Sequence, residues 1–229
     1  MRPAPASLGS GDLERHWDEK YATHGAHRVS WFEAAPETSL SLITELGVAH
    51  DAAVIDVGGG ASHLAARLLA QGFSDITVLD LSAQSLDLAR RELGTAAARV
   101  QWFEQDLLAW TPPRTYDLWH DRALFHFLVR TAERERYLDT LRAAVPAGGR
   151  ALIATFAPDG PHRCSGLPVA RYDANEIAAE VGPSFSMLTS RREEHRTPAN
   201  SIQPFTWAAL ERNVEGGLLS RPAAPGRRT

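Results

Sequence analysis

The sequence predicts an α/β fold built on one doubly wound, mostly parallel sheet within a single domain. Short apolar segments alternate with helical stretches between residues 53 and 156, and such an alternation produces parallel strands with helices on both faces. A glycine turn at residues 58–60 follows the first of these strands, and the second strand ends at the carboxylate of Asp80. The 229 residues, of which 44% are hydrophobic and 23% are charged, suffice for one substantial core.

The elements are expected in a regular order along the chain. Two helices come first, at residues 12–21 and 38–46. Five strands follow, at residues 53–57, 76–80, 99–104, 116–119 and 150–156, and the helices between them cover residues 61–71, 83–93 and 131–145. Two further β-like runs lie at residues 184–192 and 203–210, with a turn at 197–200 between them. Residues 1–10 and 216–229 are expected to be flexible ends, so the folded domain spans residues 11–215.

Composition and charge narrow the range of functions. The net charge of -4 and the pI near 6.1 argue against a protein that grips a phosphate backbone, so no nucleic acid partner is expected. Cys164 is the only cysteine, which excludes an internal disulfide and a cysteine-built zinc site. The nine histidines lack metal-ligand spacing, and no metal is expected. No apolar run suits a membrane span or a secretory signal, so we expect a cytoplasmic protein without a membrane partner.

The glycine turn carries the most specific signal in the sequence. Glycines let backbone amides approach a bound nucleotide, and a carboxylate at the end of the second strand can accept both hydroxyls of a ribose. The nicotinamide-binding pattern requires a third glycine at the position where this chain has His63. The remaining pattern, Asp56-x-Gly58-Gly59-Gly60, resembles motif I of the class I S-adenosylmethionine (SAM) methyltransferases.

This resemblance implies SAM as the cofactor and a Rossmann-like sheet of seven strands in the order 3-2-1-4-5-7-6, with the seventh strand antiparallel. By the same resemblance, Asp56 lies near the amino group of the cofactor, Asp80 binds its ribose and Asp106 binds the adenine amino group. The full set of residues expected to bind the cofactor is Trp17, Tyr21, Trp31, Asp56, Gly58, Gly59, Gly60, Ser62, Asp80, Leu81, Ser82, Asp106, Leu107 and His120.

Aromatic residues are conspicuous near the N-terminus, where the sequence has Trp17, Tyr21, Trp31 and Phe32. Their faces would attract a cationic sulfonium, and in the methyltransferases that the chain resembles this segment forms a helical lid over the cofactor. An alternative interpretation is that these side chains only attach an N-terminal helix to the core. Both interpretations remain open at the level of the sequence.

The segment after the fourth strand is expected to determine the methyl acceptor. Ligands of open α/β sheets sit beyond the carboxyl ends of the strands, and we expect Asp121, Arg122 and His126 to be catalytic. The segment resembles one in thiopurine S-methyltransferase and its bacterial chalcogen-methylating relatives. It is loosely similar to one in the methyltransferase-like protein-lysine enzymes, with Arg122 in place of a lysine. Alternatively, Asp121 and Arg122 form a structural ion pair that caps the next helix.

The sequence therefore predicts an enzyme, a SAM-dependent methyltransferase whose acceptor is a small-molecule nucleophile, with a thiol or related chalcogen favoured. Displacement at a sulfonium carbon depends on alignment and requires no metal. A protein-lysine N-methyltransferase is the alternative, followed by a non-catalytic SAM-binding protein or an NAD-dependent protein with the same sheet topology. We expect a monomer or a weak homodimer. The charged run at residues 191–196 is expected to be a solvated connection.

Overall fold

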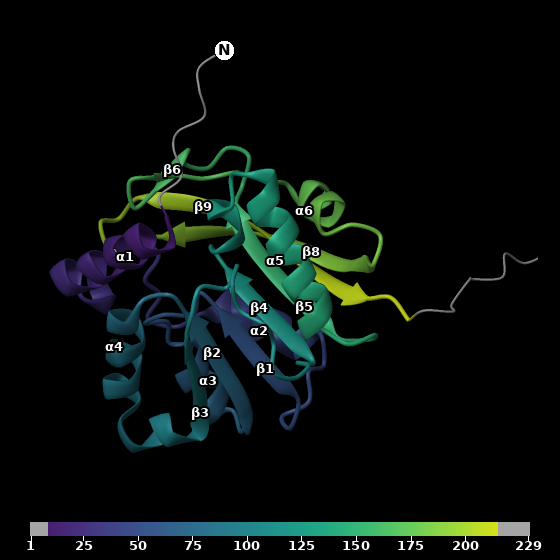
Figure 1. Ribbon diagram of the computed structural model, residues 1–229, viewed down its shortest axis with the longest axis horizontal. Coiled ribbons are helices and arrows are strands. Elements are labelled where there is room, and N and C mark those ends of the chain that lie inside the picture. Colours follow the sequence, from purple (N-terminus) through teal and green to yellow (C-terminus); the bar gives the residue numbers. More distant parts are fainter. Residues whose placement is uncertain (1–8, 215–229) are drawn as a thin grey trace, which may run out of the picture.

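A computed structural model of the protein describes residues 9–214 and contains a seven-stranded sheet in the order β3-β2-β1-β4-β5-β9-β8 (Figure 1). The strands are β1 (Ala53–Val57), β2 (Asp75–Asp80), β3 (Val100–Glu104), β4 (Leu118–Arg122), β5 (Arg150–Phe156), β8 (Phe185–Arg196) and β9 (Ile202–Arg212). The first five are parallel, whereas β9 runs antiparallel to both β5 and β8. This arrangement confirms the predicted order 3-2-1-4-5-7-6, because a short hairpin of β6 (Arg163–Cys164) and β7 (Leu167–Pro168) only shifts the numbering.

Helices cover both faces of the sheet, as a doubly wound topology requires. One face packs against α2 (Glu37–Glu45), α3 (Leu64–Ala70) and α4 (Ala83–Leu93), and the other packs against α5 (Thr131–Ala144) and α6 (Ala174–Val181). Successive side chains of a strand point to opposite faces, so Leu118 of β4 belongs to the first core and Trp119 belongs to the second. Strand β1 is buried along its whole length, as expected for a parallel strand covered on both faces.

The remaining helix, α1 (Ser10–His24), packs against α4 near the carboxyl ends of the parallel strands (Figure 1). Its Asp18 carboxylate accepts hydrogen bonds from the Ser82 hydroxyl at 2.6 Å and from the Gln84 backbone N–H at 3.2 Å. These donors lie at the N-terminus of α4, where the helix dipole favours an anion. Helix α1 is therefore attached to the sheet edge at which ligands of such folds bind.

Three local features differ from the sequence-based expectations. Strand β4 begins at Leu118 and continues to Arg122, whereas a strand at residues 116–119 was predicted. It ends there because Ala123 adopts a left-handed backbone conformation with φ 71°. The predicted helix at residues 61–71 starts at Leu64, since the glycine turn occupies the preceding residues. Helix α6 and the β6–β7 hairpin were not predicted, because the first spans only eight residues and each hairpin strand only two.

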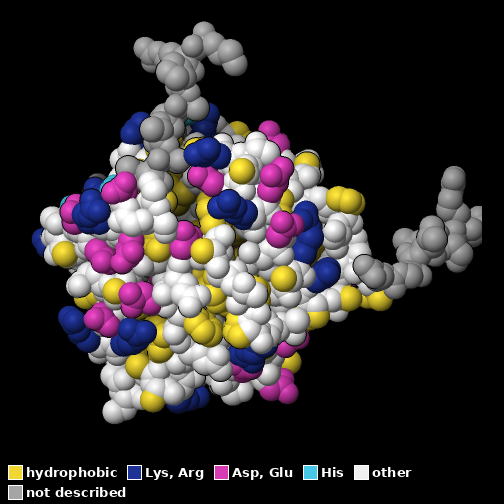
Figure 2. All heavy atoms as spheres, in the orientation of Figure 1, with side chains coloured by type: hydrophobic (Ala, Val, Ile, Leu, Met, Phe, Trp, Pro, Cys, Tyr) yellow, Lys and Arg dark blue, Asp and Glu magenta, His cyan; other side chains and the backbone are white. Residues whose placement is uncertain are grey.

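The predicted flexible ends, residues 1–10 and 216–229, lie outside the described residues apart from Gly9 and Ser10, and Ser10 is the first residue of α1. Among the residues that the structure describes, no helix combines the length and the apolar character that a membrane crossing demands. The face drawn in Figure 2 intersperses basic and acidic side chains without one continuous basic area.

Candidate active site

The glycine turn after β1 is shaped by close contacts that leave no room for side chains. Gly58 and Gly60 have φ values of 66° and 44°, in the left-handed region that favours glycine. A Cβ atom on Gly60 would lie 2.9 Å from Asp80 Oδ2 and 3.0 Å from the Tyr21 hydroxyl oxygen. A Cβ atom on Gly59 would lie 2.5 Å from Asp56 Oδ2. The two carboxylates predicted for this site therefore flank the turn directly.

Two cavities adjoin the turn, a larger one of ≈ 230 Å³ and a smaller one of ≈ 50 Å³. Four residues line both cavities and form the wall between them: Tyr21, Trp31, Gly58 and Arg122. Of the other residues predicted to bind the cofactor, Trp17, Asp80, Leu81, Asp106 and Leu107 line the larger cavity, and Asp56, Gly59, Ser62 and His120 line the smaller one. Gly60 and Ser82, which were also predicted to bind the cofactor, line neither of these two cavities.

Two carboxylates of the larger cavity follow neighbouring strands. Asp80 ends β2 and Asp106 follows β3. Burial raises the pKa of Asp80 to about 6, although the Ser82 backbone N–H donates to its Oδ1 at 2.8 Å and favours the charged form. The Asp106 carboxylate accepts a hydrogen bond from the Ser10 hydroxyl at 2.8 Å. The first residue of α1 thus contacts one end of the cavity.

One face of α1 covers the larger cavity. Leu13, Trp17 and Tyr21 are spaced three or four residues apart, so they share a face of the helix and all line the cavity. Trp31 donates its Nε1–H to the Tyr21 hydroxyl at 3.3 Å and makes an edge-to-face contact with Trp17, whose ring centroid is 5.6 Å away. Trp17 also contacts Phe127 edge to face at 5.2 Å. The N-terminal aromatic residues therefore form a roof over the cavity as well as a packing contact.

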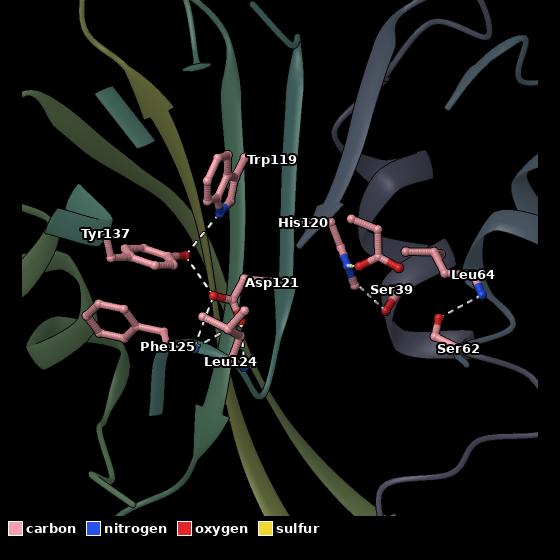
Figure 3. A network of polar contacts seen from close by, with 10 residues as sticks. Ser39, Ser62, Leu64, Trp119, His120, Asp121, Leu124, Phe125 and Tyr137 are labelled. Carbon is pink, nitrogen blue, oxygen red and sulfur yellow. Dashed lines mark hydrogen bonds and ion pairs between the residues drawn. The ribbon is translucent and has the colours of Figure 1, made fainter. Parts of the chain in front are cut away.

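His120 and Asp121 are neighbours in β4 and point to opposite faces of the sheet, because successive side chains of a strand alternate (Figure 3). His120 faces the smaller cavity, where Asp56 Oδ1 lies 2.7 Å from its Nδ1 and the Ser39 hydroxyl oxygen lies 3.0 Å from its Nε2. Asp121 faces the opposite core. There its carboxylate accepts hydrogen bonds from the Tyr137 hydroxyl at 2.7 Å and from two backbone N–H groups of the following turn.

Asp121 and His126 do not line either of these cavities, although both were predicted to be catalytic. Both side chains are fully buried. Burial raises the pKa of Asp121 to about 6, against the lowering effect of the Tyr137 hydroxyl. Burial lowers the pKa of His126 to about 3, and its Nδ1 accepts a hydrogen bond from the Phe156 backbone N–H at 3.4 Å. The capping interpretation of Asp121 fits these contacts, with backbone donors and Tyr137 as its partners instead of Arg122.

Arg122 lies in the wall between the cavities and joins the N-terminal segment to the sheet. Its guanidinium donates to the Trp31 backbone carbonyl at 3.1 Å, pairs with Glu33 at 3.1 Å and lies 3.8 Å from Glu193. It also stacks 4.6 Å above the Phe205 ring. Burial raises the pKa of Glu33 to about 8, with Arg122 opposing the shift.

The environment of Arg122 includes residues that the sequence did not single out. Glu33, Glu193 and His195 bring ligand atoms within 4.8 Å of one another, and the guanidinium already supplies a cation at that point. The expectation of a solvated connection at residues 191–196 was wrong for His195. This residue belongs to β8, is only 5% exposed, and donates its Nε2–H to the Ser30 carbonyl at 2.8 Å. The sequence signal that could have identified His195 is the alternation of outward-facing and inward-facing residues expected within a strand.

Comparison with known proteins relates part of the sequence to a domain family and the structure to a known fold. A sequence family described as "Methyltransferase domain" matches residues 54–149, whereas no curated protein matches the chain. A SAM-dependent methyltransferase from Anabaena variabilis is 17% identical, with a TM-score of 0.71 over 91% of this chain and 97% of the other. The 1,6-didemethyltoxoflavin-N1-methyltransferase of Burkholderia thailandensis is 21% identical, with a TM-score of 0.67 over 93% and 94% of the two chains.

A third solved structure concerns the conversion of a disulfide bond into a thioacetal group during echinomycin biosynthesis. It is 19% identical, with a TM-score of 0.69 over 87% of this chain and 93% of the other. At such low sequence identities, the similarity to these structures shows only a shared fold. The matched domain contains the glycine turn and both strand-end carboxylates, and the sheet order agrees with the order that this turn implied. Residues 54–149 thus match a methyltransferase domain, and the seven-stranded sheet has the fold of the class I SAM-dependent methyltransferases.

Proposed function

We propose that this methyltransferase acts on a small molecule with an apolar or aromatic body, and that the attacking atom is a thiol sulfur or a related chalcogen. The observation that carries the proposal is the lining of the larger cavity beyond its two carboxylates. Apart from Tyr21, Gln105, Arg122 and Glu133, the rest of this lining is apolar.

We place the parts of the cofactor along the sheet edge beside three carboxylates, which can accept hydrogen bonds from them. Strands β3, β2 and β1 are neighbours, and each carries or is followed by one of the carboxylates Asp106, Asp80 and Asp56. Adenine would be held at Asp106, ribose at Asp80 and the α-amino group at Asp56. Gly60 has no Cβ atom, which leaves space between the ribose position at Asp80 and the α-amino position at Asp56. When bound, SAM supplies an electrophilic methyl group on a cationic sulfonium, next to the aromatic wall of Tyr21 and Trp31.

The acceptor would then occupy the part of the cavity beyond β1 in the strand order. Its lining comes from the end of β4, the turn after it, α1 and the β6–β7 hairpin, and includes Trp17, Ala123, Leu124, Phe127, Cys164, Leu167 and Pro168. Burial raises the pKa of Cys164 to about 11, so this side chain remains a neutral thiol. An aromatic or aliphatic body matches such a lining better than a charged one.

The site offers little acid–base catalysis to the acceptor. The two residues predicted to supply it, Asp121 and His126, are buried and hydrogen-bonded within the core. A thiol needs less assistance than an amine or an alcohol, because its ordinary pKa of about 8.5 leaves a thiolate fraction at neutral pH. Arg122, the only basic residue among the described residues that line the larger cavity, favours an anionic nucleophile. The same charge disfavours the ammonium group of a lysine acceptor.

Release of S-adenosylhomocysteine (SAH) tests the proposal. We would compare a thiophenol, a phenol and an aniline with the same ring substituents, together with a lysine-containing peptide. The thiophenol is expected to be methylated fastest, with a rate that rises with pH as the thiolate forms. Turnover of the peptide or the aniline without turnover of the thiophenol would contradict the proposed acceptor. Arg122→Met should reduce the thiophenol rate by about tenfold or more while SAH still binds.

A further inference from the structure

Helix α1 covers the larger cavity although little of it is buried. Of its 15 residues, all of which the structure describes, Tyr21 alone is buried. The face of α1 that lines the cavity carries Leu13, Trp17 and Tyr21. A helix of this length has little stability of its own in water. The position of these three side chains therefore depends on the contacts that attach α1 to the rest of the protein.

Asp18 makes one of these contacts, between its carboxylate and the start of α4. Its Oδ1 accepts hydrogen bonds from the Ser82 hydroxyl at 2.6 Å and from the Gln84 backbone N–H at 3.2 Å. A distance of 2.6 Å between a hydroxyl and a carboxylate oxygen is typical of charge-assisted hydrogen bonds, which are about twice as strong as neutral ones. Asp18 directly follows Trp17 in the helix, so this contact also fixes the rotation of α1 that turns Trp17 toward the cavity.

The hydroxyl of Ser82 directs its single proton to Asp18. Ser82 is fully buried, and its hydroxyl oxygen accepts the Ser85 backbone N–H at 3.1 Å as the N-cap of α4. A hydroxyl donates one hydrogen bond, and Asp18 Oδ1 receives it. Loss of the Asp18 carboxylate would therefore leave a donor inside the protein without its partner, which is costly.

Ser82 also connects this attachment to the carboxylate that we place on the ribose. Its backbone N–H donates to Asp80 Oδ1 at 2.8 Å. At the N-terminal end of α1, the Ser10 hydroxyl donates to Asp106 Oδ2, also at 2.8 Å. Helix α1 thus contacts one cofactor carboxylate directly and reaches the other through Ser82, so the cover of the cavity is attached to the strand ends that hold the cofactor.

We propose that Asp18 is a positioning residue, which holds Trp17 and Tyr21 over the acceptor through its contact with Ser82. This inference rests on the proposed function, which places the acceptor in the larger cavity. Asp18 itself lines neither of the two cavities beside the glycine turn, whereas Trp17 and Tyr21 line the larger one. Trp17 also contacts Phe127 edge to face, so the position of α1 determines the space that an apolar acceptor enters.

The acceptor should depend on Asp18 more than the cofactor does. Asp18→Ala removes the attachment of α1, but the Ser82 backbone N–H still donates to Asp80. We expect the KM of the acceptor to rise by about tenfold, while kcat and the affinity for SAH change by less than about threefold. An unchanged KM, or an affinity for SAH that falls as much as KM rises, would overturn the inference.

Steady-state kinetics with the fastest acceptor of the panel described above measure these constants. Asp18→Asn keeps Oδ1 as an acceptor for both donors and should bring KM back to within about threefold of the unaltered protein. Glu14→Ala removes an exposed acid one turn earlier in the same helix and serves as the matched control, with no change in KM. A rise in KM in Asp18→Asn equal to that in Asp18→Ala would contradict a role based on the hydrogen bonds.

A double-mutant cycle tests whether Asp18 acts through Ser82. Ser82→Ala removes the hydroxyl donor and keeps the backbone N–H that Asp80 accepts. If the two side chains act as one link, KM in the double variant should exceed KM in the worse single variant by less than about twofold. Fully multiplied effects would show that the two residues act independently and would refute the link.

Hydrogen exchange provides a measurement that needs no acceptor. With and without SAH, the backbone amides of α1 should exchange faster in Asp18→Ala than in the unaltered protein, and Asp18→Asn should restore most of the protection. Equal exchange in all three proteins would overturn the inference. Absence of turnover with every acceptor of the panel would instead contradict the proposed function, and the exchange measurement would still decide the role of Asp18.

Discussion

The two faces of β4 carry adjacent polar residues with different roles. His120 and Asp121 are both buried and both belong to hydrogen-bonded groups (Figure 3). On the His120 face, the group of His120, Asp56 and Ser39 lines the smaller cavity. On the Asp121 face, all contacts stay inside the core, where Tyr137 also accepts a hydrogen bond from Trp119. A polar residue at the end of a strand therefore indicates a binding site only on the face that opens to a cavity.

The largest expected effect comes from removing the Asp121 carboxylate. Asp121→Ala leaves the Tyr137 hydroxyl and the backbone N–H groups of Leu124 and Phe125 without their acceptor. Unsatisfied buried donors cost about 1–3 kcal/mol each, so we expect the free energy of unfolding to fall by about 3 kcal/mol or more. Urea denaturation measures this change, and SAH affinity of the folded fraction should stay within about twofold.

His120→Asn is the control from the opposite face of the strand. It should lower the free energy of unfolding by less than Asp121→Ala, because the amide still donates to Asp56. It should change SAH affinity more than Asp121→Ala does, because His120 contacts the carboxylate of Asp56 at the smaller cavity. The comparison of the two faces fails if Asp121→Ala reduces affinity as strongly as His120→Asn.

The next largest effect is expected at Asp80, which lines the larger cavity. Asp80→Ala removes the carboxylate that we place on the ribose, and hydrogen bonds to a charged group contribute about 1.5–3 kcal/mol. SAH affinity should therefore fall by about tenfold to a hundredfold, as measured by titration calorimetry. Asp80→Asn retains an acceptor for the Ser82 N–H and should have a smaller effect. An unchanged affinity in Asp80→Ala would mean that the ribose binds elsewhere.

His126 makes the stability of the core pH-dependent. The pKa of His126 is about 3 in the folded state, below its ordinary value of 6.5. On acidification the unfolded chain therefore binds a proton at this residue, whereas the folded protein does not. The resulting stability is complete above the unfolded-state pKa and declines as pH falls toward the folded-state value. Between about pH 7.5 and about pH 5, the loss from this residue amounts to about 2 kcal/mol.

Denaturation of His126→Phe at both pH values tests this effect. The substitution keeps a ring beside Phe127 and Phe156 and removes the titrating group. The difference in stability between the two pH values should shrink by about 2 kcal/mol. An identical pH dependence in the variant and the unaltered protein would show that other groups cause the acid sensitivity.

The sequence predicted the sheet and the cofactor side of the site because those signals are local. The glycine turn, Asp80 and Asp106 each sit at the end of a strand that apolar residues define, and strand order brings them to one edge. The sequence did not predict that the Asp121 side chain points into the core, because its orientation depends on where β4 ends, and a shift of a few residues decides whether alternation applies. Glu193 and His195 were missed since their meeting with Glu33 depends on long-range packing of β8 against the N-terminal segment.

The smallest expected effect tests the turn that separates the two faces. Ala123 directly follows β4 with φ 71°, and its backbone N–H donates to the Ala154 carbonyl at 2.9 Å. A left-handed conformation costs an alanine about 1–2 kcal/mol, whereas glycine adopts it freely but loses more entropy on folding. Ala123→Gly should therefore raise the free energy of unfolding by about 0.5 kcal/mol, measured by urea denaturation.

Because Ala123 also lines the larger cavity, turnover tells whether the strained turn matters for more than stability. If the turn positions Arg122 and Leu124 around the acceptor, the glycine variant should lower kcat for the preferred acceptor while leaving SAH affinity unchanged, because glycine loosens the backbone between them. Ala123→Ser keeps a Cβ atom at this position and should retain kcat within about twofold. Equal kcat in all three proteins would reduce the turn to a structural connection between the strand and the core.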